Sequence, residues 1–117
     1  MPWEVIIGDE VGEWLDGIDE GTYELIIAAL NVLEREGPSL GRPLVDTIKG
    51  TDIKNMKELR PGSRSRSAVR ILFAFDPARR AILLVAGDKA GNWTKWYTKN
   101  IPIAEARWET HLKAMKK

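Results

Sequence analysis

The strongest constraint on the fold is a pair of apolar segments separated by a tight turn. SAVRILFAFD (67–76) and AILLVAGD (81–88) have the length and composition of strands, and residues 76–79 form the turn between them. Alternation in the first strand divides its side chains between two faces. One face carries Val69, Ile71, Phe73 and Phe75, and the other carries Ala68, Arg70, Leu72 and Ala74. We expect these strands in a small, mostly antiparallel sheet.

Arg70 is the exception in this strand. It lies on the face with the lighter side chains, and its neighbours there, Ala68 and Leu72, give the guanidinium no acidic partner. An arginine in such a position is unusual in a buried core and ordinary on the floor of a cleft. We therefore expect Arg70 to contribute more to function than to stability.

The remaining segments complete an α+β pattern. WEVIIG (3–8) indicates a strand, and apolar spacing predicts a helix over 11–18. A second helix is predicted from Thr22 to the stop signal Gly37-Pro38. Its inward residues are Leu25, Ile26, Ala29, Leu30, Val32 and Leu33. A long connection (37–54), with a short strand or turn near 44–48, leads to a strand at 55–60. After the aromatic–basic stretch 92–100, Pro102 suits the first turn of a final helix. The order is β-α-α-β-β-β-α, packed as one domain over 1–117.

Charge is divided unevenly along the chain. Residues 1–37 hold ten acidic side chains and one basic side chain, whereas residues 38–117 hold seventeen basic and seven acidic side chains. The net charge of the whole is only +1. Either the basic part presents a face to an anionic partner, or the two parts pair with each other. The positions of the basic residues favour the first interpretation.

Several classes of protein are excluded by what the sequence lacks. With no cysteine and one histidine, His111, it offers no disulfide framework, no cysteine nucleophile and no zinc site, so we expect neither a metal nor a cofactor. His111, late in the final helix, is expected at the surface. The N-terminal residues do not resemble a signal peptide, and no run approaches the length of a membrane span. These features predict a soluble, cytoplasmic protein without membrane contact.

Three basic clusters are candidates for binding an anion. They are Lys57 with Arg60; Arg64 and Arg66, with Arg70 just beyond; and Lys89, Lys95 and Lys99, interleaved with Trp93, Trp96 and Tyr97. Adjacent strands lie about 4.8 Å apart, so Arg60 and Arg70 can approach each other across a hairpin. Arginine binds phosphate oxygens bidentately, and exposed aromatic rings stack on unpaired bases. The clusters therefore point to RNA.

Each cluster also has a purely structural interpretation. Arg64 and Arg66 suit a solvated turn, and Lys57 suits ordinary cross-strand charge pairing. Trp93 and Trp96 suit packing under the last helix. The grouping of these residues favours the functional interpretation over the structural one.

The residues also carry a family resemblance. MKELRPGSRSRSAVRILFAFDP, AILLVAGDKAGNW, KWY and IPIAEARWETHL resemble the phage-derived Gp49-like toxins, HigB-type members of the RelE/ParE superfamily. The resemblance covers essentially the whole chain, including LGRPLVDTIKG. It implies a RelE-like fold and a ribosome-dependent endoribonuclease that cuts translated mRNA without a metal. It also implies a neutralising, HigA-like helix-turn-helix antitoxin as partner.

The resemblance also implies a set of site residues. Arg60, Arg70 and Lys89 match basic positions of the superfamily, and Tyr97 matches a tyrosine near the last helix. Glu58 stands where one branch has a lysine, so the proton-transfer roles are not carried over. The RNA 2′-hydroxyl is the nucleophile of this chemistry, which leaves the protein to align it and to stabilise charge. We expect Arg60 and Arg70 as phosphate clamps, Lys89 as a further stabiliser, Glu58 as base, and Tyr97 as acid or stacking residue.

Two other functions share this scaffold. A ParE-like toxin would inhibit DNA gyrase by binding it, and a non-catalytic module would only bind RNA. The paired Arg60 and Arg70, with Lys57 and Lys89, argue against the gyrase inhibitor, which has no chemical need for them.

Overall fold

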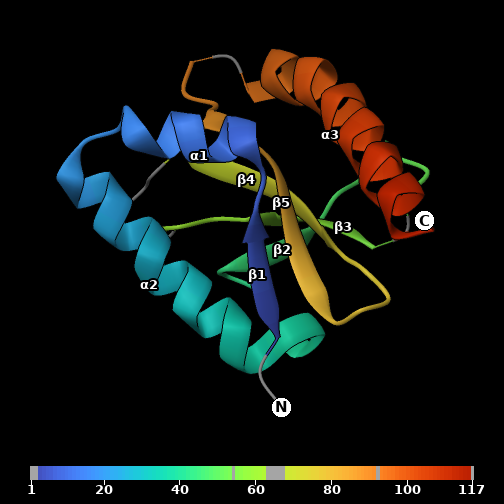
Figure 1. The fold of residues 1–117 in the computed structure, drawn as a ribbon. Coiled ribbons are helices and arrows are strands. Elements are labelled where there is room, and N and C mark those ends of the chain that lie inside the picture. Colours follow the sequence, from blue (N-terminus) through green and yellow to red (C-terminus); the bar gives the residue numbers. More distant parts are fainter. Residues whose placement is uncertain (1–2, 54, 63–67, 92, 117) are drawn as a thin grey trace.

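The computed structural model describes residues 3–53, 55–62, 68–91 and 93–116. Five strands and three α-helices, with one short 3-10 helix, make up this part of the chain (Figure 1). In chain order they are β1 (Glu4–Ile7), α1 (Asp9–Asp16), α2 (Glu20–Glu36), η1 (Gly37–Ser39), β2 (Val45–Thr47), β3 (Met56–Leu59), β4 (Val69–Phe75), β5 (Arg80–Asp88) and α3 (Trp93–Met115). The predicted α+β order is confirmed, and β2 is the short strand expected near 44–48.

The five strands form one sheet in the order β1-β5-β4-β3-β2. β1 runs parallel to β5, and all the other neighbours are antiparallel. The hairpin of β4 and β5 lies in the interior of the sheet, and every residue of β4 is buried. A strand that is covered on both faces needs apolar side chains on both, which explains the nearly continuous apolar run in this segment.

Helices cover both faces of the sheet. α1 and α2, blue to teal, lie on one side, and α3, orange to red, lies on the other (Figure 1). The predicted alternation in β4 is confirmed, because its two sets of side chains enter two separate cores. The core under α1 and α2 includes Val69, Ile71, Phe73 and Phe75, with Ile26, Ala29, Leu30 and Leu33 of α2. The core under α3 includes Leu72 and Ala74, with Ile101, Ala104 and Trp108 of α3.

Two expectations about the helices are wrong. Leu25 of α2 is 42% exposed instead of buried, because it lies off the stripe formed by Ile26, Ala29 and Leu33. The last helix begins at Trp93, so Pro102 lies inside it and not in its first turn. An interior proline costs a helix about 3 kcal/mol, but the earlier turns carry Ile101 and other apolar residues onto the sheet. Packing therefore outweighs the local signal of the proline.

The turn between β4 and β5 is organised by the buried carboxylate of Asp76. One oxygen accepts hydrogen bonds from the backbone N–H groups of Ala78 and Arg80, and the other accepts from the Arg80 guanidinium at 2.9 Å. His111 of α3 lies 2.8 Å from the second oxygen, so the expectation of a surface histidine is wrong. Burial favours a higher pKa for Asp76, but the bonds from His111 and Arg80 outweigh it and lower that pKa.

Among the helices of the described residues, none combines the length and apolarity needed to cross a bilayer.

Gly87 of β5 provides a test of the packing between the sheet and α3. A Cβ atom at this position would lie 2.6 Å from Nε1 of Trp96, so the indole that packs α3 on the sheet must shift to accept it. We expect Gly87→Ala to lower the free energy of unfolding by about 1–3 kcal/mol in urea titrations. Gly41→Ala is the matched control, because no atom of the described residues lies within 4 Å of a Cβ placed there, and it should unfold like the parent. Equal stability of the two variants would contradict this account.

Candidate functional site

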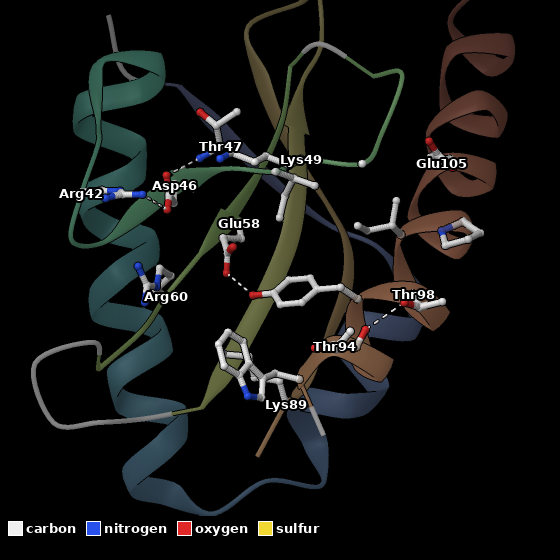
Figure 2. Close-up of a pocket in the computed structure, with 16 residues that line it drawn as sticks. Arg42, Asp46, Thr47, Lys49, Glu58, Arg60, Lys89, Thr94, Thr98 and Glu105 are labelled. Carbon is white, nitrogen blue, oxygen red and sulfur yellow. Dashed lines mark hydrogen bonds and ion pairs between the residues drawn. The ribbon is translucent and has the colours of Figure 1, made fainter. Parts of the chain in front are cut away.

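A cleft of about 850 Å³ opens between the β2–β3 side of the sheet and the first half of α3 (Figure 2). Its wall on the sheet side comes from the segment around β2 and from the end of β3. Its other wall is one face of α3, on which residues recur at helical spacing. The lining residues are Arg42, Asp46, Thr47, Ile48, Lys49, Gly50, Glu58, Arg60, Lys89, Trp93, Thr94, Tyr97, Thr98, Ile101, Pro102 and Glu105.

The Glu58 carboxylate occupies the centre of the cleft (Figure 2). Its Oε1 accepts a 2.7 Å hydrogen bond from the Tyr97 hydroxyl and lies 3.2 Å from Nε of Arg70. The sheet register explains why these side chains meet. Glu58 pairs with Leu72 on β4, and Arg70 lies two positions from Leu72, so Glu58 and Arg70 project from the same face of the sheet. β3, β4 and α3 each contribute one member of this cluster, which we call the Glu58–Arg70–Tyr97 triad.

Arg70 differs from its expectation in two respects. The expected lack of an acidic partner is wrong, because alternation along one strand does not reveal Glu58 on the neighbouring strand. The side chain is also only 6% exposed, and Arg70 is absent from the cleft lining. Its Nη1 donates to the Val69 carbonyl at 2.7 Å. Arg70 therefore lies beneath the cleft and holds Glu58 from behind.

Arg60 and Lys89 bring positive charge to the cleft itself. Arg60 directly follows β3, two positions after Glu58, and its side chain lines the cleft. The Nε of Arg60 is buried and has no hydrogen-bond partner in the described part of the chain. Burial lowers the pKa of Lys89, and the nearby charges of Arg70 and Arg60 lower it further, against the pull of Glu58. The local excess of cations suits an anionic ligand.

Tyr97 is half-buried and neutral in this setting. Desolvation raises its pKa, and donation to the anionic Glu58 raises it further. Since a hydrogen bond to a carboxylate requires the proton, the hydroxyl stays protonated and directed at Glu58. The ring also meets Trp96 edge-on, with 5.1 Å between centroids. Tyr97 is therefore a packed residue of the triad.

The other predicted RNA-binding residues are scattered. Lys57 lies on the opposite face of β3 from Glu58, and Lys95 and Lys99 are exposed on α3 away from the cleft-lining face. Trp93 lines the cleft and is 61% exposed, so the interpretation as a packed residue is wrong for it. Trp96 packs over Gly87, in agreement with the interpretation of this residue as part of the packing. Arg64 and Arg66 lie outside the described residues.

Several lining residues were missed in the sequence. Asp46 forms an ion pair with Arg42 at 2.9 Å, and Glu105 accepts from the Thr51 hydroxyl at 2.7 Å (Figure 2 labels Arg42, Asp46 and Glu105). Arg42 and Asp46 lie in the predicted connection 37–54, where no periodic pattern indicates which side chains are functional. Glu105 had a usable signal, because it follows Tyr97 and Ile101 at four-residue spacing on one helix face. Within the described residues, no three potential metal-ligating side chains converge.

Comparison with known proteins gives consistent relatives. Residues 13–109 match the family described as phage-derived, Gp49-like proteins. HigB2 of Mycobacterium tuberculosis (strain ATCC 25618 / H37Rv), named as a candidate toxin, is 61% identical over 104 residues, which are 89% of this chain and 52% of HigB2. HigB3 of the same organism, named likewise, is 51% identical over 108 residues, or 92% of each chain. The chain thus spans about half of HigB2 and nearly all of HigB3.

A solved structure shares the fold. The crystal structure of the archaeal RelE–RelB complex from Pyrococcus horikoshii OT3 contains a chain that aligns with a TM-score of 0.60 at 17% identity. The alignment covers 78% of this chain and 99% of that chain. The predicted RelE-like fold is confirmed by this match.

The ion pair inside the triad makes a prediction about stability. Arg70→Met leaves the Glu58 carboxylate buried without its guanidinium, so we expect a loss of about 3–5 kcal/mol in urea unfolding. The double variant Arg70→Met/Glu58→Leu removes both charges and should recover much of that loss. Lys113→Met, at an exposed position of α3, is the control and should stay within about 0.5 kcal/mol of the parent. Additive losses at positions 70 and 58 would show that the pair is not coupled.

Proposed function

Because the chain belongs to the phage-derived Gp49-like family, we propose that it is the toxin of a type II toxin–antitoxin pair and cuts translated mRNA. Two relatives named as candidate toxins, at 61% and 51% identity, support the first part. The composition of the cleft supports the second part.

The observation that carries the nuclease proposal is the group of cations around the Glu58 carboxylate, in a cleft lined by four cations and three acidic side chains. Arg60 and Lys89 line the cleft near Glu58, and Arg70 lies beneath it. Glu58 offsets only part of this positive charge, and like charges held close together are costly unless a further anion lies between them. A phosphodiester supplies that anion, and its oxygens suit both the guanidinium fork and the ammonium. A surface that only docks on a protein has no need of such a cluster.

The reaction requires no nucleophile from the protein. The 2′-oxygen of the RNA attacks the adjacent phosphorus, the bond from phosphorus to the 5′-oxygen breaks, and a 2′,3′-cyclic phosphate and a 5′-hydroxyl result. Glu58 takes the proton from the 2′-hydroxyl, while Arg60 stabilises the developing charge on the phosphate oxygens. No metal is used, because these cations meet the charge.

The second proton goes to the departing 5′-oxygen. Tyr97 suits this task poorly, since its raised pKa makes the phenol a weaker acid and its hydroxyl is directed at Glu58. Lys89 suits it better, because the lowered pKa of its ammonium makes it a stronger acid. In this assignment Tyr97 and Arg70 are positioning residues that hold Glu58, and Arg70 does not contact phosphate.

Partners are proposed on the same basis. The solved archaeal RelE chain with this fold is in complex with RelB. We therefore place a neutralising antitoxin, of the HigA-like helix-turn-helix kind, beside this chain. The ribosome and its mRNA are the target in the cytoplasm.

The first test separates cleavage from other modes of toxicity. We expect induction of the parent protein in bacteria to stop growth and to create new mRNA 5′ ends inside translated frames. Arg60→Ala and Glu58→Gln should reduce cleavage about 100-fold or more, since each removes charge stabilisation or proton transfer. Glu58→Gln keeps an oxygen that accepts from Tyr97 but removes the charge that pairs with Arg70, so its unfolding in urea is measured beside its activity.

Lys113→Ala is the matched control, a cation removed from the far end of α3, and should stay fully toxic. Growth arrest without new 5′ ends, unchanged in Arg60→Ala, would contradict the nuclease proposal and favour an inhibitor of another target such as gyrase.

The second test concerns the ribosome. His111, late in α3, contacts Asp76 and does not line the cleft. The cleft therefore lacks a histidine for general acid–base catalysis. We expect the pure protein to cut naked single-stranded RNA slowly or not at all and to cut mRNA on purified ribosomes. Rapid turnover of free RNA would contradict this dependence.

A further inference from the structure

We propose that Trp93 is the stacking platform for an unpaired nucleobase next to the scissile phosphate, and that Lys89 links this platform to the phosphate site. The proposal rests on the proposed function and specifies how the cleft holds its substrate. It concerns three aromatic residues, Trp93, Trp96 and Tyr97, that lie within two turns of α3 and differ in their surroundings.

Two of these aromatic residues are already engaged. Trp96 packs so closely over Gly87 that a Cβ there would meet its indole at 2.6 Å. Tyr97 donates to Glu58 and packs edge-on against Trp96. A base that stacked on the face of Tyr97 would have to displace contacts of a half-buried ring. Tyr97 is therefore poorly suited to the stacking role that the sequence left open to it.

Trp93 has the opposite surroundings. It is 61% exposed, more than any other large apolar side chain that the described residues expose, and it still lines the cleft. So large an apolar ring loses favourable burial while it stays in water, and its contact with Lys89 covers only part of it. A ring at the mouth of a cationic cleft gains that burial when a base covers it.

Lys89 joins the platform to the phosphate site. Its ammonium lies 4.4 Å from the centroid of the Trp93 ring and 5.8 Å from that of Tyr97. The cation–π contact orients the indole and keeps a positive charge beside it. Because a nucleobase and its phosphate are separated by one sugar, a phosphate at Lys89 brings a base to Trp93. A protein partner would favour an apolar surround for an anchor residue, whereas here the ammonium of Lys89 lies over the ring.

The platform predicts what the cleft recognises. Stacking accepts every base because each has a π face, so Trp93 should favour any unpaired base over an abasic site. The larger purine rings should bind somewhat better than pyrimidines.

The test is an NMR titration of the full chain with a short 2′-O-methyl RNA, which binds but lacks the nucleophile. The indole N–H signals report each tryptophan, and Trp93→Phe assigns the one of interest. We expect the Trp93 signal to move on adding the intact oligonucleotide. It should move less with inorganic phosphate, which reaches Lys89 but covers no face of the ring, and an abasic residue at one position should weaken binding by about 10-fold or more.

Variants separate the platform from the phosphate site. Trp93→Leu should bind the intact and abasic chains equally, whereas Trp93→Phe should keep most of the preference. Tyr23→Leu, at an exposed aromatic residue of α2, is the matched control and should behave like the parent.

Two results would overturn the proposal in distinguishable ways. If Arg60→Ala loses binding while Trp93→Leu still discriminates against the abasic chain, the platform is wrong and the nuclease site stands. If no cleft signal responds to any of the oligonucleotides, the platform is wrong, and the mRNA 5′ ends mapped after induction decide separately whether the nuclease proposal stands.

Discussion

The arrangement of the site depends on one buried interaction, the contact of Glu58 with Arg70 and Tyr97. A carboxylate and a guanidinium this far from water are tolerated only when each has a partner. The contact joins β3 to β4 and both to the first half of α3, which forms one wall of the cleft. Arg70 is committed beneath Glu58, so the cations that line the cleft itself are Arg42, Lys49, Arg60 and Lys89. The same contact therefore determines the packing of the helix and the polarity of the site.

The acidic part of the chain lies away from the cleft, whose lining holds four cations and three acidic side chains. The acidic helices α1 and α2 lie on the face of the sheet opposite α3, so they do not neutralise the cleft (Figure 1). Arg107 and Glu10, 3.9 Å apart, join the acidic and basic parts of the chain, whereas the other ion pairs described above lie within residues 38–117. Of the two interpretations of the uneven charge, separation of an acidic and a basic surface fits the structure better than mutual pairing.

Local patterns in the sequence predicted most of the elements and only part of the site. Alternation in β4 placed Val69 and Leu72 on their correct faces, and apolar spacing placed Ile26 and Leu33 of α2 in the core. The same alternation applied to β3 would have separated Lys57 from Glu58. The start of α3 could not be predicted in this way, because Pro102 resembles a helix start and the packing that overrides it involves the distant sheet.

The sequence by itself determined the α+β order, the two faces of the central strand, the uneven charge and the family to which the chain belongs. These are properties of residues near one another along the chain, or of the whole pattern read in order. Only the tertiary structure decided that Glu58 meets Arg70 and Tyr97, that Lys57 faces away and that Trp93 stays exposed. The reason is that Tyr97 lies 39 positions from Glu58, and their contact depends on strand register and on the packing of α3 against the sheet. No local period encodes these two relations.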